Sequence, residues 1–368
     1  MGLDPQPTEA RFFAHPLVRL QPAEAGSWLL ARSDRRRGHQ VSSKVAAVVV
    51  RCFEPATLNE IALLAGLEDP APELLAVVQS LIEFEYLYTK SDEAERAAET
   101  LLLWSQFNWR ASAQYFVQTK GYQFERYEPD GTSAEDLARM RAYNEVETDT
   151  DRSKAPPVDP AHSYRLPDIS SSLADQDAVT ALTGSPFSGV VDKAAILSLL
   201  TLVTRPVALA WTPFPTAAPV IRKTSPSGGS RHPTELYAFT DGIDGIADSW
   251  YHVAGVEGQM SSLPLPKSAS ECLELAKVPQ PAGPWVLLVF TSVFRRNRYR
   301  YREPRTFRTV HMDVGHIMTT TEFIANAFGM RVDHATQINS AALGTLLQID
   351  PLVESPISAS LICGGRSK

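Results

Sequence analysis

The first ninety residues alternate brief apolar runs with polar turns, a pattern typical of a small mixed domain. The segments 28–31 and 40–42 are strand-like and are separated by the polar turn Arg35–Gly38. Three short amphipathic helices are expected after them, and Tyr86–Tyr88 has the pattern of a closing strand. The predicted order is therefore strand, turn, strand, three helices and strand.

The borders of these helices carry specific signals. Ser42 or Ser43 is a candidate N-cap for the first helix, and Pro55 is expected to end it. Thr57 and Glu60 have the spacing of a capping box at the start of the second helix. The third helix is predicted after Asp69-Pro70, with an apolar face made of Leu74, Val77, Val78, Leu81 and Ile82.

Residues 1–90 are expected to form one domain. Their element order resembles the small winged-helix-like fold of peptide-chaperone proteins that bind leader peptides of ribosomally made natural products. A helical cap or dimerisation domain is an alternative. A DNA-binding winged helix is a further one, because Arg32 and Arg35–Arg37 cluster in a turn.

Residues 91–164 are predicted to be a helical connector and linker. An aromatic band runs from Trp104 to Tyr127, and packing in a core is its expected role, with a stacking surface as the alternative. The polar, proline-containing stretch 149–162 is the best linker candidate.

The pattern changes from residue 165 onward. Runs at 235–240, 250–253 and 285–291 are strand-like, whereas 194–203 and 311–328 are predicted helices. Helices and strands mix without regular βαβ spacing, which indicates an α+β domain over 165–368.

Composition narrows the function classes. The chain has 368 residues and a net charge of -7, so a broad nucleic-acid-binding face is not indicated. Its three cysteines are scattered, which argues against a zinc site or a disulfide framework. Neither a signal peptide nor an apolar run long enough to cross a membrane is seen, so a soluble cytoplasmic protein is expected.

The segment from Ser225 to Pro233, Ser-Pro-Ser-Gly-Gly-Ser-Arg-His-Pro, carries the strongest chemical signal. Adjacent glycines let a backbone approach a ligand closely, and the flanking serines offer hydroxyl donors. Arg231 adds a fixed positive charge. Such a loop suits a flat, polar-edged, anionic cofactor, although the same composition also occurs in surface turns.

The same segment, continued through Thr234-Glu235-Leu236-Tyr237, resembles the nitroreductase-like dehydrogenases that act on ribosomally made peptides, the SagB/ThcOx-type or McbC-like azoline oxidases. Further elements of that family follow in order, at Gly245–Val253, Arg305–Arg308, His311–His316, Gly344–Pro351 and Ile362–Gly365. The resemblance covers roughly 165–368 and extends more weakly to 101–150. It implies an α+β, nitroreductase-like domain with an antiparallel-dominated sheet flanked by helices.

This resemblance also implies FMN bound at a homodimer interface. The implied flavin contacts are Ser225, Pro226, Ser227, Gly228 and Gly229, with Arg231 near the ring edge or the phosphate. Arg305 and Arg308 would hold the phosphate or brace the dimer, and Gly364, Gly365 and Arg366 would close over the cofactor.

Two departures from the family pattern matter. The arginines that usually begin this domain are missing from 182–187, so Arg222, Lys223, Arg231 or Arg366 would have to hold the phosphate. The usual Lys-Tyr pair is also missing, since the chain reads Arg298-Tyr299-Arg300-Tyr301-Arg302 there. An arginine cannot act as a base, so Tyr301 or Tyr299 is the candidate base.

Three histidines remain as candidates for other roles. His311 and His316 flank Asp313, but five residues on a helix put them on different faces, so no metal site is predicted. His232, inside the loop motif, is the better catalytic candidate, with a structural role as its alternative.

The favoured hypothesis is an FMN-dependent dehydrogenase that oxidises a precursor peptide, by azoline-to-azole conversion or a related desaturation. One alternative is a flavin reductase of dehydroamino acids or small electrophiles that uses NAD(P)H. Another is a catalytically altered peptide-binding or scaffold subunit. Expected partners are the leader and core of the peptide, a second copy of the chain and other peptide-modifying enzymes, with neither nucleic acid nor membrane.

Overall fold

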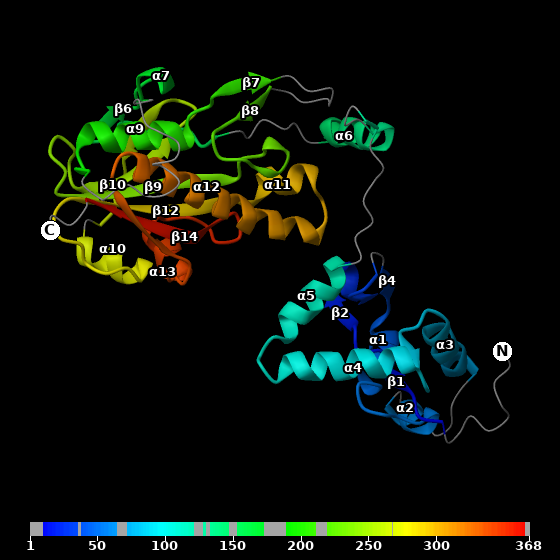
Figure 1. Cartoon of the computed structure of the whole chain (residues 1–368). Helices are drawn as coiled ribbons and strands as arrows, with labels where there is room; N and C mark the ends of the chain where they lie inside the picture. The colour runs from blue at the N-terminus through cyan, green and yellow to red at the C-terminus, as the bar shows by residue number, and fades with distance from the viewer. Residues whose placement is uncertain are drawn as a thin grey trace. The chain divides into compact units, whose positions relative to one another are not determined.

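The chain forms two compact units in the computed structural model, Met1–Phe124 and Glu125–Lys368 (Figure 1). The structure describes residues 10–35, 38–64, 72–120, 128–129, 133–146, 153–172, 189–210, 219–266 and 268–364. Each unit has its own hydrophobic core and is described by itself.

The described part of the N-terminal unit combines two small antiparallel sheets with five α-helices. Its elements are β1 Phe13–Ala14, β2 Val18–Pro22, β3 Trp28–Arg32, β4 Gly38–Val41, α1 Ser43–Arg51, α2 Leu58–Leu64, α3 Pro72–Glu83, β5 Leu87–Tyr88, α4 Asp92–Ser105 and α5 Arg110–Lys120. The strand order is β2-β3-β4 in one sheet, and β1 pairs with β5 in another. The predicted run of two strands, three helices and a strand is therefore present.

The predicted capping signals are formed in this unit. The backbone N–H of Val45 donates to Ser42 Oγ at the start of α1. Thr57 N donates to Glu60 Oε2 over 2.9 Å, and Glu60 N donates to Thr57 Oγ1 over 3.3 Å, which completes the capping box. Local sequence alone fixes these two helix starts.

The division between the units differs from the predicted boundaries at 90 and 164. Helices α4 and α5 belong to the N-terminal unit, because Leu101 and Ala113 pack with Leu17 in a small apolar cluster. The segment 91–164 is thus split between the two units. The apolar face of an amphipathic helix does not determine which neighbouring element covers it, so the sequence pattern could not assign α4 and α5 to a unit.

The aromatic band differs from the expectation of core packing. Phe107 and Trp109, in the turn between α4 and α5, are exposed by 68% and 59%, and Phe116 on α5 is exposed by 45%. Residues 122, 124 and 127 of the band lie outside the described residues.

The C-terminal unit is built on a seven-stranded sheet in the order β13-β14-β12-β9-β10-β11-β6. All its strand pairs are antiparallel, which confirms the predicted α+β class. The strands are β6 Ser163–Arg165, β9 Thr234–Asp241, β10 Ser249–Ala254, β11 Gln259–Ser262, β12 Trp285–Val293, β13 Arg331–Ala335 and β14 Glu354–Cys363. A separate pair consists of β7 Ala208–Ala210 and β8 Val220–Arg222.

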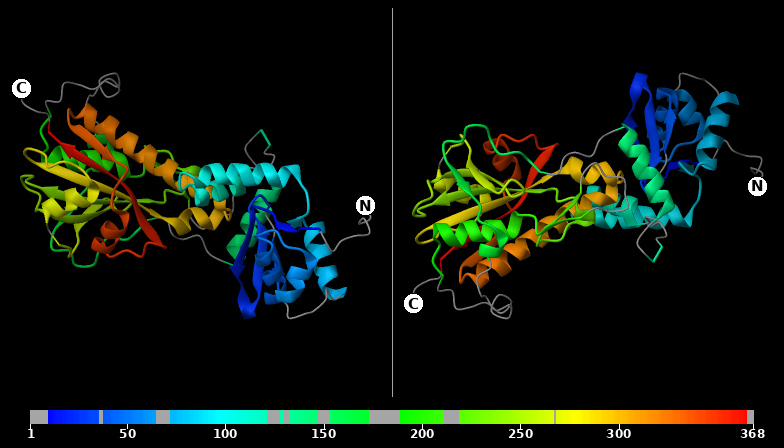
Figure 2. Two further views of the ribbon diagram at one scale, coloured as in Figure 1. Left: turned by 90° about the horizontal axis from the view of Figure 1, so that it is seen from below. Right: turned by 90° about the horizontal axis from the view of Figure 1, so that it is seen from above.

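Helices cover both faces of this sheet (Figure 1; Figure 2). Side chains alternate along each strand, so Leu236 and Leu288 pack toward α9 Lys193–Thr204 and α12 Phe307–Ala327. Tyr237 and Leu287 face the opposite way, toward α10 Ala269–Ala276 and α13 Ser340–Leu346. The unit also contains α6 Ala134–Val146, α7 Ile169–Ser172, α11 Phe294–Arg300 and the short 3-10 turns η2 Gly228–Ser230 and η3 Pro304–Thr306.

Part of the predicted linker 149–162 is held against the C-terminal sheet. Ser153 Oγ donates to Glu257 over 2.7 Å, and Lys154 N donates to Glu235 over 3.1 Å. The polar side chain of Ser153 and the backbone of Lys154 therefore make defined contacts with the C-terminal unit. Among the described residues, no helix has both the length and the apolar character needed to span a membrane.

Candidate functional site

The Ser225–Pro233 loop connects β8 to β9 and has an unusual backbone. Gly229, Ser230 and His232 have φ angles of 61°, 53° and 45°, in the left-handed region. Only glycine adopts this region without cost, so the other two residues hold strain of about 1–3 kcal/mol each. Such strain persists only where surrounding contacts fix the loop.

Asp313 of α12 supplies the main contact. Its carboxylate accepts from Ser227 Oγ over 2.9 Å and from the backbone N–H of Gly228 over 3.0 Å. Asp313 is 3% exposed, and this burial raises its pKa even though both hydrogen bonds oppose the rise. The spacing His311-x-Asp313-x-x-His316 thus marks an aspartate that anchors the loop, a role that the sequence interpretation missed.

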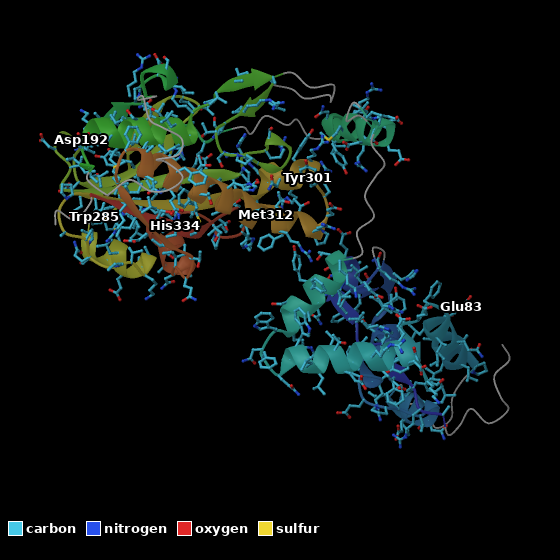
Figure 3. All side chains as sticks on the ribbon, in the orientation of Figure 1. Glu83, Asp192, Trp285, Tyr301, Met312 and His334 are labelled. Carbon is cyan, nitrogen blue, oxygen red and sulfur yellow. The ribbon has the colours of Figure 1, made fainter. Side chains whose placement is uncertain are left out.

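The two glycines of the loop have no room for a side chain. A Cβ on Gly229 would collide with the hydroxyl oxygen of Tyr301, and one on Gly228 would lie 2.5 Å from Thr309 Cγ2. These contacts place Tyr301, a predicted catalytic residue, directly against the loop. Figure 3 labels Tyr301 at the corner between α11 and α12.

His232 is buried and braces the loop. Its Nε2 lies 2.8 Å from the carbonyl oxygen of Ile221, and its backbone N–H donates to Ser227 Oγ over 2.9 Å. Burial, followed by the charge of Lys223, lowers the pKa of His232 to about 4. The ring is therefore neutral near pH 7 and engaged with β8, a geometry that favours the structural alternative for this residue.

Arg231 is buried at 4% exposure, and its Nε donates to the carbonyl oxygen of Arg296 over 2.6 Å. Its guanidinium also lies 5.4 Å from the centroid of the Tyr299 ring. Arg231 thus binds α11 in this structure.

A buried ionic cluster lies beneath the loop. Arg296 forms an ion pair with Glu235 over 2.5 Å and donates to the carbonyl oxygen of His232 over 3.1 Å. Glu235 also contacts His252 Nε2 over 2.9 Å. Burial alone would raise the pKa of Glu235, but the hydrogen bond to His252 and the charge of Arg296 lower it to about 2. The cluster therefore contains a carboxylate that is ionised at neutral pH.

Lys223 stands between the loop and this cluster. It contributes to the walls of two small cavities, one shared with Ser225, Ser227 and His232, the other with Glu235. Burial lowers the pKa of Lys223, and Arg296 adds to that effect, while Glu235 opposes it. Within the described part of the chain, no ion pair or hydrogen bond of this ammonium group is found. An anion at the loop would therefore stabilise its charged form.

The two candidate tyrosines have different surroundings. The hydroxyl of Tyr299 donates to Asn144 of α6, and its ring packs edge-on against Tyr143 at a centroid distance of 6.5 Å. Tyr301 is half-buried beside Gly229 and lies under the guanidinium of Arg300, 5.4 Å from its ring centroid. Arg300 itself forms an ion pair with Asp136 over 2.6 Å.

The remaining predicted residues are spread over the unit. Arg305 lies in η3 and Arg308 in the first turn of α12, and both are half-buried. Gly364 follows the end of β14, whereas the loop meets the other end of the sheet, where Val293 N donates to Pro233 O. Nine strand steps separate the two ends, roughly 30 Å at ~3.3 Å per residue. Within one chain Gly364 therefore does not close over the loop, and Gly365, Arg366 and 182–187 lie outside the described residues.

Comparison with known proteins gives one curated relative of clear similarity. The chain is 32% identical over 150 residues to the trifolitoxin-processing protein TfxB of Rhizobium leguminosarum bv. trifolii, and the match spans 39% of each protein. This relative confirms the resemblance to maturation proteins drawn from the motifs. No protein-family model matches the chain.

Solved structures with similar chains include nitroreductases and a microcin synthetase. A putative nitroreductase from Anabaena variabilis has 19% identity and a TM-score of 0.43, with 61% of this chain and 45% of that chain covered. The Escherichia coli McbBCD complex with truncated pro-MccB17 has a chain with 15% identity and a TM-score of 0.37. The match covers 73% of this chain and 94% of that chain. A putative nitroreductase in complex with FMN from Desulfovibrio desulfuricans has 14% identity and a TM-score of 0.32. The match covers 53% of this chain and 89% of that chain.

Proposed function

We propose that this protein is an FMN-dependent oxidoreductase that dehydrogenates a ribosomally made precursor peptide. The observation that carries the proposal is the Ser225–Pro233 loop, strained, anchored by Asp313 and held against Tyr301. Similarity to a toxin-processing protein supports the choice of a peptide as substrate.

The residues around the loop fit the chemistry of a flavin mononucleotide. The Ser227 hydroxyl and the Gly228 N–H donate to Asp313, so the remaining serine hydroxyls and glycine backbone of the loop would serve the ring carbonyls. Among the candidate cations for the phosphate, Arg231 is engaged with α11, and Arg222 is exposed on β8. Lys223 is the best placed, because it lies beside Ser225 and Ser227 and has no carboxylate partner among the described residues. Ser225, Ser227, Gly228, Gly229 and Lys223 are therefore the proposed cofactor contacts.

Tyr301 is the proposed base. A bound flavin supplies the acceptor for a hydride from the substrate carbon, and a base must take the proton from the neighbouring atom. The Tyr301 hydroxyl is next to the loop, whereas that of Tyr299 is bound to Asn144. Arg300, at the position nearest the missing lysine, is paired with Asp136 and stays charged.

Flavin binding is tested by the absorbance of the purified full chain. We expect flavin bands, released as FMN on denaturation, and a loss of most bound flavin in Gly229→Ala. Gly283→Ala is the matched control, because Gly283 has a φ of 78° but no atom lies within 4 Å of the position that a Cβ would take there. A colourless wild-type protein that FMN does not reconstitute would overturn the proposal.

The direction of the reaction is tested anaerobically. We expect a cyclodehydrated precursor peptide to bleach the bound flavin, and Tyr301→Phe to slow the bleaching more than Tyr299→Phe. Bleaching by NAD(P)H alone would instead support the reductase alternative. The ion-paired Arg300, which stands where a base-forming lysine is expected, also favours that alternative.

The assembly is proposed by the same reasoning. A second copy of the chain completes the cofactor site, and the N-terminal unit, whose element order is that of the predicted winged-helix-like domain, holds the leader peptide. Other peptide-modifying enzymes are the expected partners in a cytoplasmic complex. Light scattering on the eluting protein measures the dimer, and titration of a labelled leader peptide into residues 1–124 measures its binding.

A further inference from the structure

A cavity of about 560 Å³ lies between α11, η3 and the first turn of α12. Its wall includes Arg295, Arg298, Arg302, Phe294, Tyr301 and Phe307. This volume falls in the range of cavities that hold small ligands or a few side chains. The proposed function uses only Tyr301 from this wall.

The cavity has more cationic than anionic side chains in its described wall. Three arginines and the carboxylate of Glu303 are the charged side chains among the described residues that line it. Arg302 is held in place, since its guanidinium lies 3.8 Å from the centroid of the Tyr143 ring and its Nε donates to the carbonyl oxygen of Tyr299. Arginine forks placed in this way bind carboxylates, often in pairs of parallel hydrogen bonds.

Asn297 adds a second, independent sign of a ligand. Its side chain lines the cavity and is 1% exposed, and neither polar atom has a hydrogen bond of normal geometry within the described residues. The amide is near Asp313 and opposes the burial that raises the pKa of that carboxyl. Buried amides are nearly always satisfied, so a polar group entering the cavity would complete this one.

The cavity is open and adjoins the loop. Arg295, Arg298 and Arg302 are exposed, and Phe307 is 49% exposed, so a ligand there stays in contact with solvent. Tyr301 forms part of the wall and touches Gly229 with its hydroxyl. An open, cationic cavity beside the reacting site suits a segment of an extended chain better than an enclosed cofactor.

We propose that this cavity binds an acidic segment of the peptide substrate, whose carboxylates pair with Arg298 and Arg302 while an adjacent residue reaches Tyr301. The proposal rests on the proposed function for the identity of the site next to it. It assigns the arginine-rich run of α11 to substrate recognition.

The test uses the full, FMN-loaded chain at low salt. The probe is a fluorescein-labelled synthetic peptide of glycine and serine with three consecutive aspartates, and its partner peptide carries three asparagines instead. Fluorescence anisotropy measures the binding of both. Arg298→Ala is compared with Arg141→Ala, because Arg141 is exposed on α6 and is absent from the cavity wall.

We expect the aspartate peptide to bind more tightly than the asparagine peptide. Arg298→Ala should weaken it by up to about fivefold, the loss of one exposed ion pair, while Arg141→Ala leaves it unchanged. Charge reversal in Arg298→Glu should weaken it further. These results would support the proposal.

Equal binding of the two peptides, or equal effects of the two arginine substitutions, would overturn it. Loss of FMN in Arg298→Ala with unchanged peptide binding would also overturn it and would assign the cavity to the cofactor. Because anisotropy reports peptide binding and absorbance reports flavin, failure of this proposal is distinguishable from failure of the proposed function.

Discussion

Each unit contains a buried arginine in an ionic cluster, but the two clusters differ in how exposed the acidic side chains are. In the N-terminal unit Arg32 pairs with Asp34, Glu85 and Glu93, whose side chains are 25%, 55% and 68% exposed. In the C-terminal unit Arg296 pairs with Glu235, which is 8% exposed and in turn contacts the buried His252. Only the second cluster is closed to water on both sides of the ion pair.

This difference separates two uses of a buried charge. Carboxylates at the surface can be rehydrated when their partner is lost, so the Arg32 cluster resembles a set of surface ion pairs joined at one buried end. The Arg296 cluster lies under the strained loop and holds the carbonyl oxygen of His232. There the loss of one partner leaves an uncompensated charge in the interior.

The largest effect is expected for Glu235→Leu. It leaves Arg296 buried without its carboxylate, and we expect the free energy of unfolding of the C-terminal unit to fall by about 3–5 kcal/mol. Chemical denaturation monitored by hydrogen exchange, with the exchange of each unit analysed separately, measures the loss. The double variant Glu235→Leu with Arg296→Met should recover much of it, and a double variant as unstable as the single one would contradict this account.

Acid should weaken both units below about pH 6.5. Burial, with Arg32 and Lys223 as the next causes, lowers the pKa of His15 and of His232 to about 4 from 6.5. Their unfolded forms take up protons first, so each unit should lose up to about 3 kcal/mol as pH falls from 6.5 to 4. The pKa of Glu235, lowered to about 2 from 4.5, extends the loss in the C-terminal unit to lower pH.

Unit-resolved hydrogen exchange between pH 7 and 3 measures this dependence. His15→Gln should flatten the curve of the N-terminal unit between pH 6.5 and 4 and leave that of the C-terminal unit as it is. Equal flattening of both curves would argue against separate histidines as their cause.

A smaller effect is expected for Arg32→Met. The three carboxylates can turn to water, and the methionine side chain retains most of the apolar contact, so the N-terminal unit should lose about 1–2 kcal/mol. Denaturant midpoints of the isolated residues 1–124 and of the full chain both report it. A loss as large as that from Glu235→Leu would show that the exposure of the three carboxylates does not determine how much stability is lost.

The smallest effect is expected at the rim of the same cluster. Arg35 contacts Glu85, and their side chains are 45% and 55% exposed. Arg35→Ala should change stability by less than about 1 kcal/mol, and 0.5 M salt should remove the difference. Thermal unfolding at two salt concentrations is sufficient to measure it.

Local patterns in the chain were enough to predict the elements and the loop. The capping box at Thr57 and Glu60, the strand runs of the C-terminal sheet and the glycine pair at 228–229 depend on local spacing and backbone freedom, so they could be read in advance. The resemblance of ordered motifs, rather than any single one, indicated the chemistry of the loop.

Which side chains meet at the loop depends on the three-dimensional arrangement. Asp313 is 86 residues from Ser227 in sequence, yet it anchors the loop; Tyr301 reaches Gly229, while Tyr299 turns to Asn144; and Gly364 lies at the far end of β14. The placement of α4 and α5 on the N-terminal unit likewise results from packing. Long-range contacts of this kind depend on how strands are ordered and helices docked, and local propensity does not encode that order.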